Sequence, residues 1–298
     1  MGITGRSMMK KILITGSSGF IGKNLTEYLQ SAGYSISAPL HQELDLLDEK
    51  KVGEYLKKAQ YDIVIHAANT NMMNPVPYDV LNTNLRMFYN LEKYCGEYGR
   101  MYYFGSGAEY DRTAMPDNVS EEHFGTAIPS DSYGFTKYLM HKTASQKNNI
   151  YDLCIFGVYG KYEQWERRFI SNNIVRSLKR LPMTLKKNAY FDYLYIDDLC
   201  KIMVWFIENE PQYKHYNVCT SKPIDLLSLA YMINEVSGLG CEIIVRAEGW
   251  QPEYSGDNGR LLNEMNGFEF TDKKQTIQKL WEYYEEHINE IDEKRLLL

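Results

Sequence analysis

Short apolar runs alternate along the chain with segments whose apolar residues recur at helical spacing. The runs at 11–15 (KILIT), 61–68 (YDIVIHAA) and 101–106 (MYYFGS) are continuous, which is typical of strands buried in a parallel sheet. A further short strand is expected near 34–38. Amphipathic patterns predict helices from a glycine-rich turn to Gly33 and over 48–59, 79–98 and 131–147. This alternation predicts βαβ units and a parallel sheet covered by helices on both faces.

Beyond residue 160 the alternation becomes irregular, which predicts a second domain. We expect one more strand over 151–160 (YDLCIFGVYG) and then a Lys- and Arg-rich irregular stretch over 161–190. The strand–turn–helix pattern of FDYLYIDDLCKIMVWFIEN follows, and later elements are predicted at 224–237 (helix), 241–247 (strand) and 273–290 (helix). The predicted fold class is α/β, a Rossmann doubly wound parallel sheet with a smaller, partly interleaved C-terminal substrate domain. Its parts are a leader or cloning remnant at 1–8, an NAD(P)-binding domain at 9–160 to which 191–220 returns, and a substrate-binding domain at 161–190 and 221–298.

The stretch TGSSGFIG places three glycines between the first strand and the first helix. In such a turn the first glycine makes the tight bend, the second lets the backbone approach a pyrophosphate, and the third lets the helix pack against the strand. The helix N-terminus then offers free N–H groups and the positive end of its dipole to phosphates. We therefore predict a dinucleotide site that includes Gly16, Ser17, Ser18, Gly19, Phe20, Ile21 and Gly22.

The choice between NAD and NADP is open in the sequence. Folds of this kind that bind NAD usually carry an acidic residue at the end of the second strand, where it holds the ribose hydroxyls. Here that strand runs into SAPLHQE, in which His41 is the nearest polar candidate and no arginine stands ready for a 2′-phosphate. The missing carboxylate favours NADP mildly, and NAD stays possible. The other residues that we place in the cofactor site are Asp45, Leu46, Ala67, Ala68, Asn84, Tyr133 and Lys137.

Composition mainly excludes some classes of partner and of binding site. The net charge of −6 leaves no basic field for nucleic acid or an anionic membrane, so any bound phosphate must be held by a local site. No apolar run approaches the ~20 residues that span a bilayer. The five cysteines are dispersed without a C-x-x-C spacing, which predicts reduced thiols in a cytoplasmic protein and no metal site.

Tyr133 and Lys137 lie four residues apart on one predicted helix, and Ser106 ends the strand before it. A surface i,i+4 pair is the ordinary explanation for such spacing. A second pair, Tyr138 and Lys142, is shifted by five residues, about 140° around the helix, and cannot share the same site. At the carboxyl edge of the sheet, Lys137 would favour the tyrosinate form of Tyr133 and would also hold the nicotinamide ribose. Tyr133 would then exchange a proton with a carbinol oxygen held by Ser106 while hydride moves at the carbon.

The stretches TGSSGFIG, NLRMFYNLEK, FGSGAEY, SYGFTK, FGVYG and FDYLYIDDL, in this order, resemble the motifs of the extended short-chain dehydrogenase/reductase family. These are NAD(P)-dependent nucleotide-sugar epimerases, dehydratases and reductases, and the resemblance covers nearly the whole chain. It implies that Ser106, Tyr133 and Lys137 are the catalytic triad. It also implies a structural or catalytic role for Asn84 and a homodimer formed through the Tyr–Lys helix and its neighbour.

Within that family, HQELDLLD and EGWQPEYSGDNGRLL are similar to the GDP-fucose synthase-like reductases. Gly107 and Ala108 stand where the 4,6-dehydratases carry an Asp–Glu pair, which argues against dehydration. The epimerising acid/base pair is also missing, because Ala108 and Arg168 occupy its positions. The resemblance therefore implies reduction of a 4-keto nucleotide sugar with NADPH. A nucleotide-sugar 4-epimerase with tightly bound NAD is the alternative, and a non-catalytic NAD(P)-binding sensor or scaffold is the alternative from another class.

Substrate contacts are expected from both predicted domains. Phe191 stands where relatives carry an arginine that helps to bind the nucleotide, so another cation must take that role. We expect Arg260 to do so, because an arginine can hold a diphosphate through two parallel hydrogen bonds. The predicted substrate-binding residues are Ser106, Gly107, Ala108, Arg168 and Arg260.

Overall fold

The computed structural model describes residues 10–70 and 79–297. The leader predicted at 1–8 lies outside the described residues. Contacts divide the chain into two units, of which the first comprises 1–109, 128–154 and 203–215 and the second comprises 110–127, 155–202 and 216–298. The two units are interleaved along the chain, and each is described by itself below.

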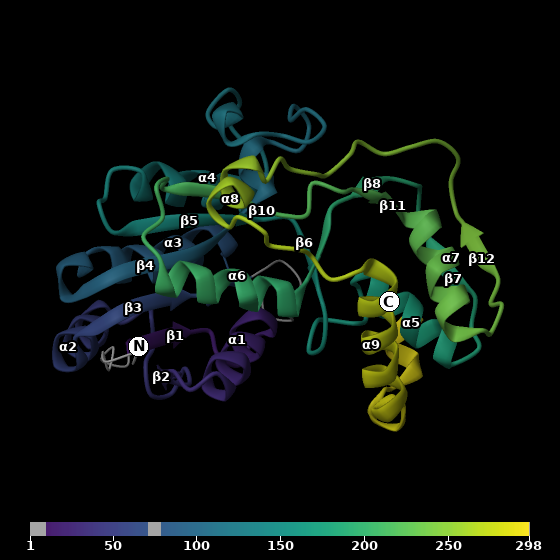
Figure 1. Cartoon of the computed structure of the whole chain (residues 1–298), viewed down its shortest axis with the longest axis horizontal. Helices are drawn as coiled ribbons and strands as arrows, with labels where there is room; N and C mark the ends of the chain where they lie inside the picture. The colour runs from purple at the N-terminus through teal and green to yellow at the C-terminus, as the bar shows by residue number, and fades with distance from the viewer. Residues whose placement is uncertain (1–9, 71–78, 298) are drawn as a thin grey trace, which may run out of the picture. The chain divides into compact units, whose positions relative to one another are not determined.

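The first unit is built on a six-stranded sheet with the order β10-β5-β4-β3-β1-β2 (Figure 1). β1 pairs in parallel with β2 and β3, and β3 pairs in parallel with β4. The chain leaves β1 in one direction towards β2 and returns on its other side at β3, so the two βα loops diverge there and leave room for a ligand. The strands are β1 (Lys11–Thr15), β2 (Ser35–Ser37), β3 (Tyr61–His66), β4 (Tyr98–Ser106), β5 (Ile150–Ile155) and β10 (His215–Val218).

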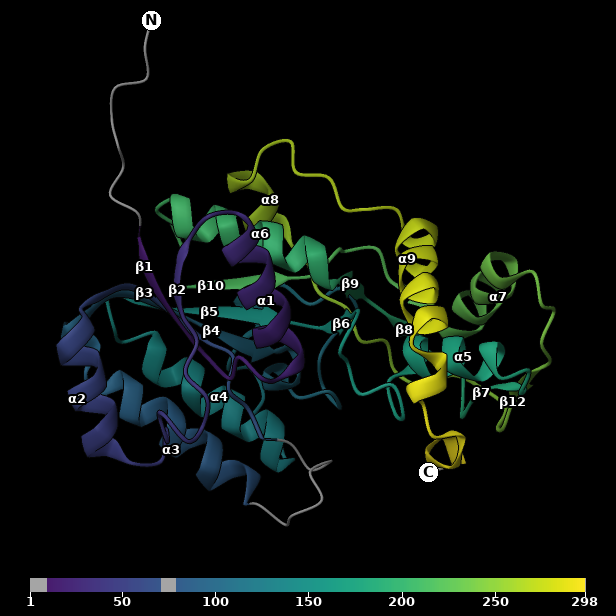
Figure 2. The same ribbon diagram turned by 90° about the horizontal axis from the view of Figure 1, so that it is seen from below.

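Helices cover both faces of this sheet, and Figure 2 shows the two layers. One face carries α1 (Phe20–Ser31) and the end of α6 (Ile196–Glu208), and the other carries α2 (Glu49–Ala59), α3 (Val80–Glu92) and α4 (Ser132–Ala144). Strand residues on the second face share one buried cluster with helix residues, among them Val64, Phe88 and Met140. The predicted α/β Rossmann architecture is therefore confirmed.

Aspartate caps start many of the described helices. Asp131 precedes α4, and its side chain accepts hydrogen bonds from the backbone N–H groups of Tyr133 (3.0 Å) and Gly134 (2.9 Å). Such a cap satisfies N–H groups that have no partner inside the helix. Side chains that cap other helices in the same way belong to Asp48, Asp79, Asp225 and Asp272.

The second unit contains the remaining helices and three small strand pairs. β7 pairs with β12 and β6 with β9 in parallel, whereas β8 pairs with β11 in antiparallel fashion. The strands are β6 (Gly157–Tyr159), β7 (Met183–Leu185), β8 (Tyr190–Phe191), β9 (Tyr193–Tyr195), β11 (Ile224–Asp225) and β12 (Ile243–Val245). The helices are α5 (Phe169–Leu178), α7 (Leu226–Ser237), α8 (Gly259–Glu264) and α9 (Lys273–Glu286). Over residues 10–70 and 79–297, short 3-10 turns of both units occur at Cys95–Glu97, Gly107–Tyr110, Glu121–His123, Ile288–Glu290 and Glu293–Leu297.

The structure divides one predicted strand and contains regular elements in the stretch expected to be irregular. The strand expected over 151–160 is two strands interrupted at Phe156, because β5 belongs to the large sheet whereas β6 pairs with β9. The stretch expected to be irregular over 161–190 contains α5 and β7. The apolar face of α5 includes the buried Ile170 and Ile174, and the basic pairs that flank the helix, Arg167–Arg168 and Lys179–Arg180, obscured its helical period. Among the described residues, no helix is both long and apolar enough to cross a bilayer.

Candidate active site

The glycine-rich turn after β1 is sterically closed to larger residues. Gly16 has a left-handed φ of +74°, and a Cβ added to it would lie 2.5 Å from the Cα of Ala68. A Cβ on Gly22 would overlap the carbonyl oxygen of Gly16, because α1 packs directly on the turn. α1 begins after Gly19 without a side-chain cap, so backbone N–H groups at this helix end are left for a ligand. These features fit the phosphates of a dinucleotide.

A cavity of about 350 Å³ lies beside this turn, within the first unit. The residues that line it come from the end of β1, the loop after β2, the end of β3 and the start of α3. The lining contains the predicted Gly16, Ser17, Ser18, Gly19, His41, Asp45, Leu46, Ala67 and Ala68. The sequence reasoning missed Thr15, Pro39, Leu44, Leu47, Asn69, Thr70, Thr83 and Met87, most of which belong to loops without a motif. Phe20, Ile21 and Gly22 are outside the lining and form the first turn of α1.

Asn84 holds the loop that follows β3. Its Oδ1 accepts a hydrogen bond from the N–H of Thr70, and its Nδ2 donates one to the carbonyl of Thr70, each at 2.8 Å. Asn84 is 3% exposed. Because both ends of the carboxamide are used on one backbone position, the structure places Asn84 as a support for the cavity wall. A direct contact with the cofactor stays a prediction.

The residues of the predicted triad lie on β4 and α4 of the first unit. Ser106 is the last residue of β4 and is buried, and its Oγ accepts a hydrogen bond from the N–H of Ala108 (3.3 Å). Lys137 is 4% exposed, and its Nζ donates to the carbonyl of Phe104 at 2.7 Å. The same Nζ lies 5.8 Å from the ring centre of Tyr133, one helical turn away. The ammonium is thus anchored two residues before Ser106 and faces the phenol.

The second Tyr–Lys pair of α4 is different in its surroundings. Tyr138 stacks on Phe135, with ring centres 6.5 Å apart, and Lys142 is exposed. A buried ammonium is costly unless its surroundings stabilise the charge, whereas an exposed one is not. Burial therefore separates Lys137 from Lys142, as expected of a cation with a chemical role.

Charge around the triad is set by burial and by a few neighbours. Burial lowers the pKa of Lys137 to about 8, although the carboxylates of Asp152 and Glu109 oppose the shift. Burial also lowers the pKa of His66 to about 3, with a further contribution from Lys137. His66 is therefore neutral at pH 7, and its Nδ1 lies 2.8 Å from the Oγ1 of Thr15. His66 is part of the wall between β1 and β3.

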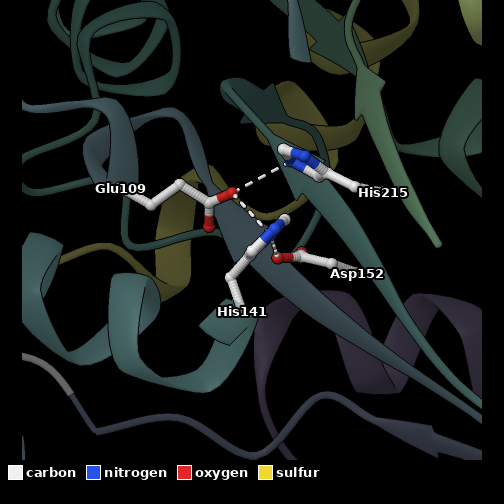
Figure 3. Close-up of side chains that lie close together, drawn as sticks. All are labelled: Glu109, His141, Asp152 and His215. Carbon is white, nitrogen blue, oxygen red and sulfur yellow. Dashed lines mark hydrogen bonds and ion pairs between the residues drawn. The ribbon is translucent and has the colours of Figure 1, made fainter. Parts of the chain in front are cut away.

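Four buried polar side chains lie close together on elements of the first unit (Figure 3). We call Glu109, His141, Asp152 and His215 the Glu–His–Asp–His cluster. Nδ1 of His141 lies 2.9 Å from Oδ2 of Asp152, and Nε2 of His215 lies 3.0 Å from Oε1 of Glu109. The four could also ligate a metal ion, since their ligand atoms lie within 4.8 Å of one another. Sequence reasoning missed the cluster, although a carboxylate in the apolar strand YDLCI was a usable signal.

The predicted cations of the second unit have partners of their own. Arg260 forms ion pairs with Glu122 (2.6 Å) and Glu121 (3.7 Å), and a hydrogen bond from Arg260 lowers the pKa of Glu122 to about 2. Arg168 is exposed at the start of α5. Phe191 stacks on Tyr193, with ring centres 5.7 Å apart. The substrate roles of Arg168 and Arg260 stay predictions, and binding to a diphosphate would draw Arg260 from its carboxylates.

The fold and the cavity beside the glycine turn define a dinucleotide-binding α/β protein. Residues 12–219 match the model of the NAD dependent epimerase/dehydratase family. The chain therefore belongs to that family and is an enzyme. The resemblance to the extended short-chain dehydrogenases/reductases is confirmed.

The individual relatives share low sequence identity with this chain. GDP-L-colitose synthase of Yersinia pseudotuberculosis is 26% identical over 227 residues, which are 67% of this chain and 72% of that protein. GDP-6-deoxy-D-talose 4-dehydrogenase of Aggregatibacter actinomycetemcomitans is 22% identical over 293 residues, 91% of this chain and 97% of that protein. The crystal structure of a GDP-L-fucose synthetase from Naegleria fowleri bound to NADP superimposes with a TM-score of 0.84 at 15% identity and covers 94% of both chains. At such identity the structural likeness establishes the fold.

Proposed function

We propose that this enzyme is an NADP-dependent oxidoreductase that acts at C4 of a nucleotide-activated sugar and reduces a 4-keto sugar. The observation that carries the proposal is the buried Lys137, fixed on the carbonyl of Phe104 and facing Tyr133 next to Ser106. A buried cation facing a phenol on one helix suits proton transfer to a substrate oxygen. The names of the relatives support the same class, because they describe GDP-sugar synthases and a 4-dehydrogenase.

The reduction needs a hydride and a proton, and the chain handles the proton. Bound NADPH would supply the hydride to C4. Tyr133 would donate its phenolic proton to the C4 oxygen, so that the ketone becomes an alcohol. Lys137 would stabilise the tyrosinate that remains, and Oγ of Ser106 would donate a hydrogen bond to the same oxygen.

The residues after Ser106 and at the end of β2 limit the reaction and the cofactor that we propose. Gly107 and Ala108 follow Ser106 and have no group that can move a proton, so no acid/base pair is available there for dehydration or epimerisation. NADP is favoured over NAD because the end of β2 lacks a carboxylate for the ribose hydroxyls. The homodimer through α4 and its neighbour and the cytoplasmic location stay predictions, and sedimentation of the purified protein tests the first of them.

The first test concerns the cofactor. The protein is denatured after purification, and any released nucleotide is identified by mass spectrometry. We expect an empty site that binds added NADPH more tightly than NADH. Near-stoichiometric NAD or NADH would contradict the reductase and indicate a 4-epimerase that recycles its hydride. Binding of neither cofactor would contradict both.

The second test concerns turnover. NADPH oxidation is followed with a set of 4-keto sugar nucleotides for the parent protein, Tyr133→Phe and the matched control Tyr138→Phe. We expect Tyr133→Phe to lose roughly 100-fold or more of the rate while it retains NADPH binding, because general acid catalysis contributes about 10²- to 10⁴-fold. Tyr138→Phe should behave as the parent. Absence of turnover in the parent on every sugar nucleotide would favour a non-catalytic sensor or scaffold.

A further inference from the structure

The Glu–His–Asp–His cluster joins every element that carries the triad. Glu109 lies in the turn after β4, His141 lies one turn after Lys137 on α4, Asp152 lies on β5, and His215 begins β10. Glu109 and Asp152 are at most 1% exposed, and the two histidines are 6–8% exposed. Such a group of charges is costly to bury unless its members pair with one another, and each imidazole here does contact a carboxylate.

The carboxylates of Glu109 and Asp152 contact β4, the strand that ends at Ser106. The N–H of Ser106 points to Oε2 of Glu109 at 3.4 Å, and the hydroxyl of Tyr103 donates to Oδ2 of Asp152 at 2.6 Å. A Cβ on Gly105 would lie 2.9 Å from Oε2 of Glu109 and closer still to Oδ1 of Asp152. The two carboxylates therefore support the backbone from 103 to 106, and this segment includes the Phe104 carbonyl that receives the ammonium of Lys137.

Contacts within the cluster favour the charged forms of Glu109 and His141. Burial opposes ionisation of Glu109, but its contacts with His141 and His215 outweigh burial and lower its pKa to about 2. Burial likewise opposes protonation of His141, and its bonds to Asp152 and Glu109 raise its pKa to about 9. Asp152 and Glu109 also raise the pKa of the buried Lys137, which lies outside the cluster, and so oppose the effect of burial on its charge.

We propose that the Glu–His–Asp–His cluster is a positioning element of the active site, which holds the end of β4 under Ser106 and supplies the negative charge that keeps the buried Lys137 protonated. The inference deepens the proposed function and rests on it for the role of the triad. The cluster touches none of the reacting atoms. It acts through Lys137, whose charge Tyr133 requires.

Other titratable groups around Lys137 do not supply this charge. His66 on β3 is neutral at pH 7, and its protonated form would repel the ammonium. Tyr133 on α4 is the group that the ammonium serves. Cys154 on β5 raises the pKa of Lys137 less than Asp152 and Glu109 do. The two carboxylates are therefore the main source of stabilisation.

The test titrates Lys137 directly in substrate-free protein. Lysine labelled at its terminal carbon is followed by NMR against pH, and the resonance of Lys137 is the one that Lys137→Met lacks. The parent midpoint should lie at about 8. Asp152→Asn and Glu109→Gln, each of which removes one negative charge without a change of size, should lower it by about one pH unit, a tenfold change in the ionisation constant. His141→Gln removes a positive charge and should shift the midpoint upwards.

Opposite shifts from the two kinds of variant distinguish a charge effect from damaged packing. The matched control is Asp198→Asn, which removes a carboxylate that is 1% exposed and hydrogen-bonded to Thr271 in the second unit. It should leave the midpoint of Lys137 unchanged. The proposal is wrong if both charge-removing variants, with native circular dichroism, titrate like Asp198→Asn, or if His141→Gln lowers the midpoint.

Two further measurements complete the test. Elemental analysis that finds one metal ion per chain, lost in Asp152→Asn, would overturn the proposal, because the metal and not Lys137 would then neutralise the carboxylates. Where a substrate is turned over, the alkaline fall of kcat/KM should begin about one pH unit lower in Asp152→Asn than in the parent. The NMR titration needs no substrate, so a failure of the proposed reaction does not affect its outcome.

Discussion

Gly16 and Gly33 give a matched test of the glycine turn. Both have left-handed backbones, with φ of +74° and +88°, so alanine is strained at either position by about 1–2 kcal/mol. A Cβ at Gly33 has nothing within 4 Å, whereas a Cβ at Gly16 would lie 2.5 Å from the backbone of Ala68. Ordinary contact begins at 3.4 Å, so the backbone must yield by 0.9 Å (3.4 minus 2.5). Overpacking of this kind costs a further ~1–3 kcal/mol.

We therefore expect Gly33→Ala to lower the free energy of unfolding by about 1–2 kcal/mol and Gly16→Ala by about 2–5 kcal/mol. Gly16→Ala should also weaken NADPH binding by roughly 10- to 100-fold, the loss of one hydrogen bond to a charged phosphate, while Gly33→Ala should bind as the parent does. Urea unfolding and fluorescence titration with NADPH measure the two quantities. Equal destabilisation by both variants, together with unchanged NADPH affinity in Gly16→Ala, would refute the close-approach argument.

The remaining predictions concern supports of the site. Asn84→Ala should lower the free energy of urea unfolding by about 2–3 kcal/mol, because the buried N–H and carbonyl of Thr70 lose their partner. The control Asn82→Ala, at an exposed position, should lower it by less than about 0.5 kcal/mol. Similar values for the two variants would contradict the supporting role of Asn84. Asp131→Ala and the matched cap variant Asp48→Ala should each lower the free energy of unfolding by about 1 kcal/mol. Only Asp131→Ala should lower turnover, because the Asp131 cap fixes the start of α4, which carries Tyr133. Equal turnover in the two variants would contradict a role of this cap in the active site. His41→Ala should weaken NADPH binding several-fold and leave NADH binding unchanged, because His41 lines the cavity after β2, where the two cofactors differ. An unchanged ratio of NADPH to NADH affinity would mean that other residues distinguish the two cofactors.

The elements with strong local signals were predictable from the sequence. The glycine turn, β1 and α1 depend on residues that are adjacent in the chain, and the structure has them where the sequence predicted them. The helix expected over 79–98 ends earlier, at Glu92, because Tyr98 already belongs to β4. Local pattern cannot decide where a helix yields to a strand when both segments are apolar.

The Glu–His–Asp–His cluster could not be predicted in the same way. Its members come from positions 109, 141, 152 and 215, and only the order of β4, β5 and β10 in the sheet brings them together. Each residue alone has an ordinary explanation, such as a polar residue at the end of a strand. The one local anomaly, Asp152 inside a buried strand, predicts a partner but not its identity.

The site uses different sources of charge for binding and for chemistry. Among the described residues that line the cavity there is no Lys or Arg, and the lining includes the acidic residue Asp45. In the proposed cofactor site the phosphates would therefore be held by backbone N–H groups and the N-terminus of α1. In the proposed reaction the ammonium of the buried Lys137 serves the phenol of Tyr133 instead. Because backbone dipoles hold the phosphates, buried carboxylates such as Asp152 can lie close to Lys137 without also facing the anionic part of the ligand.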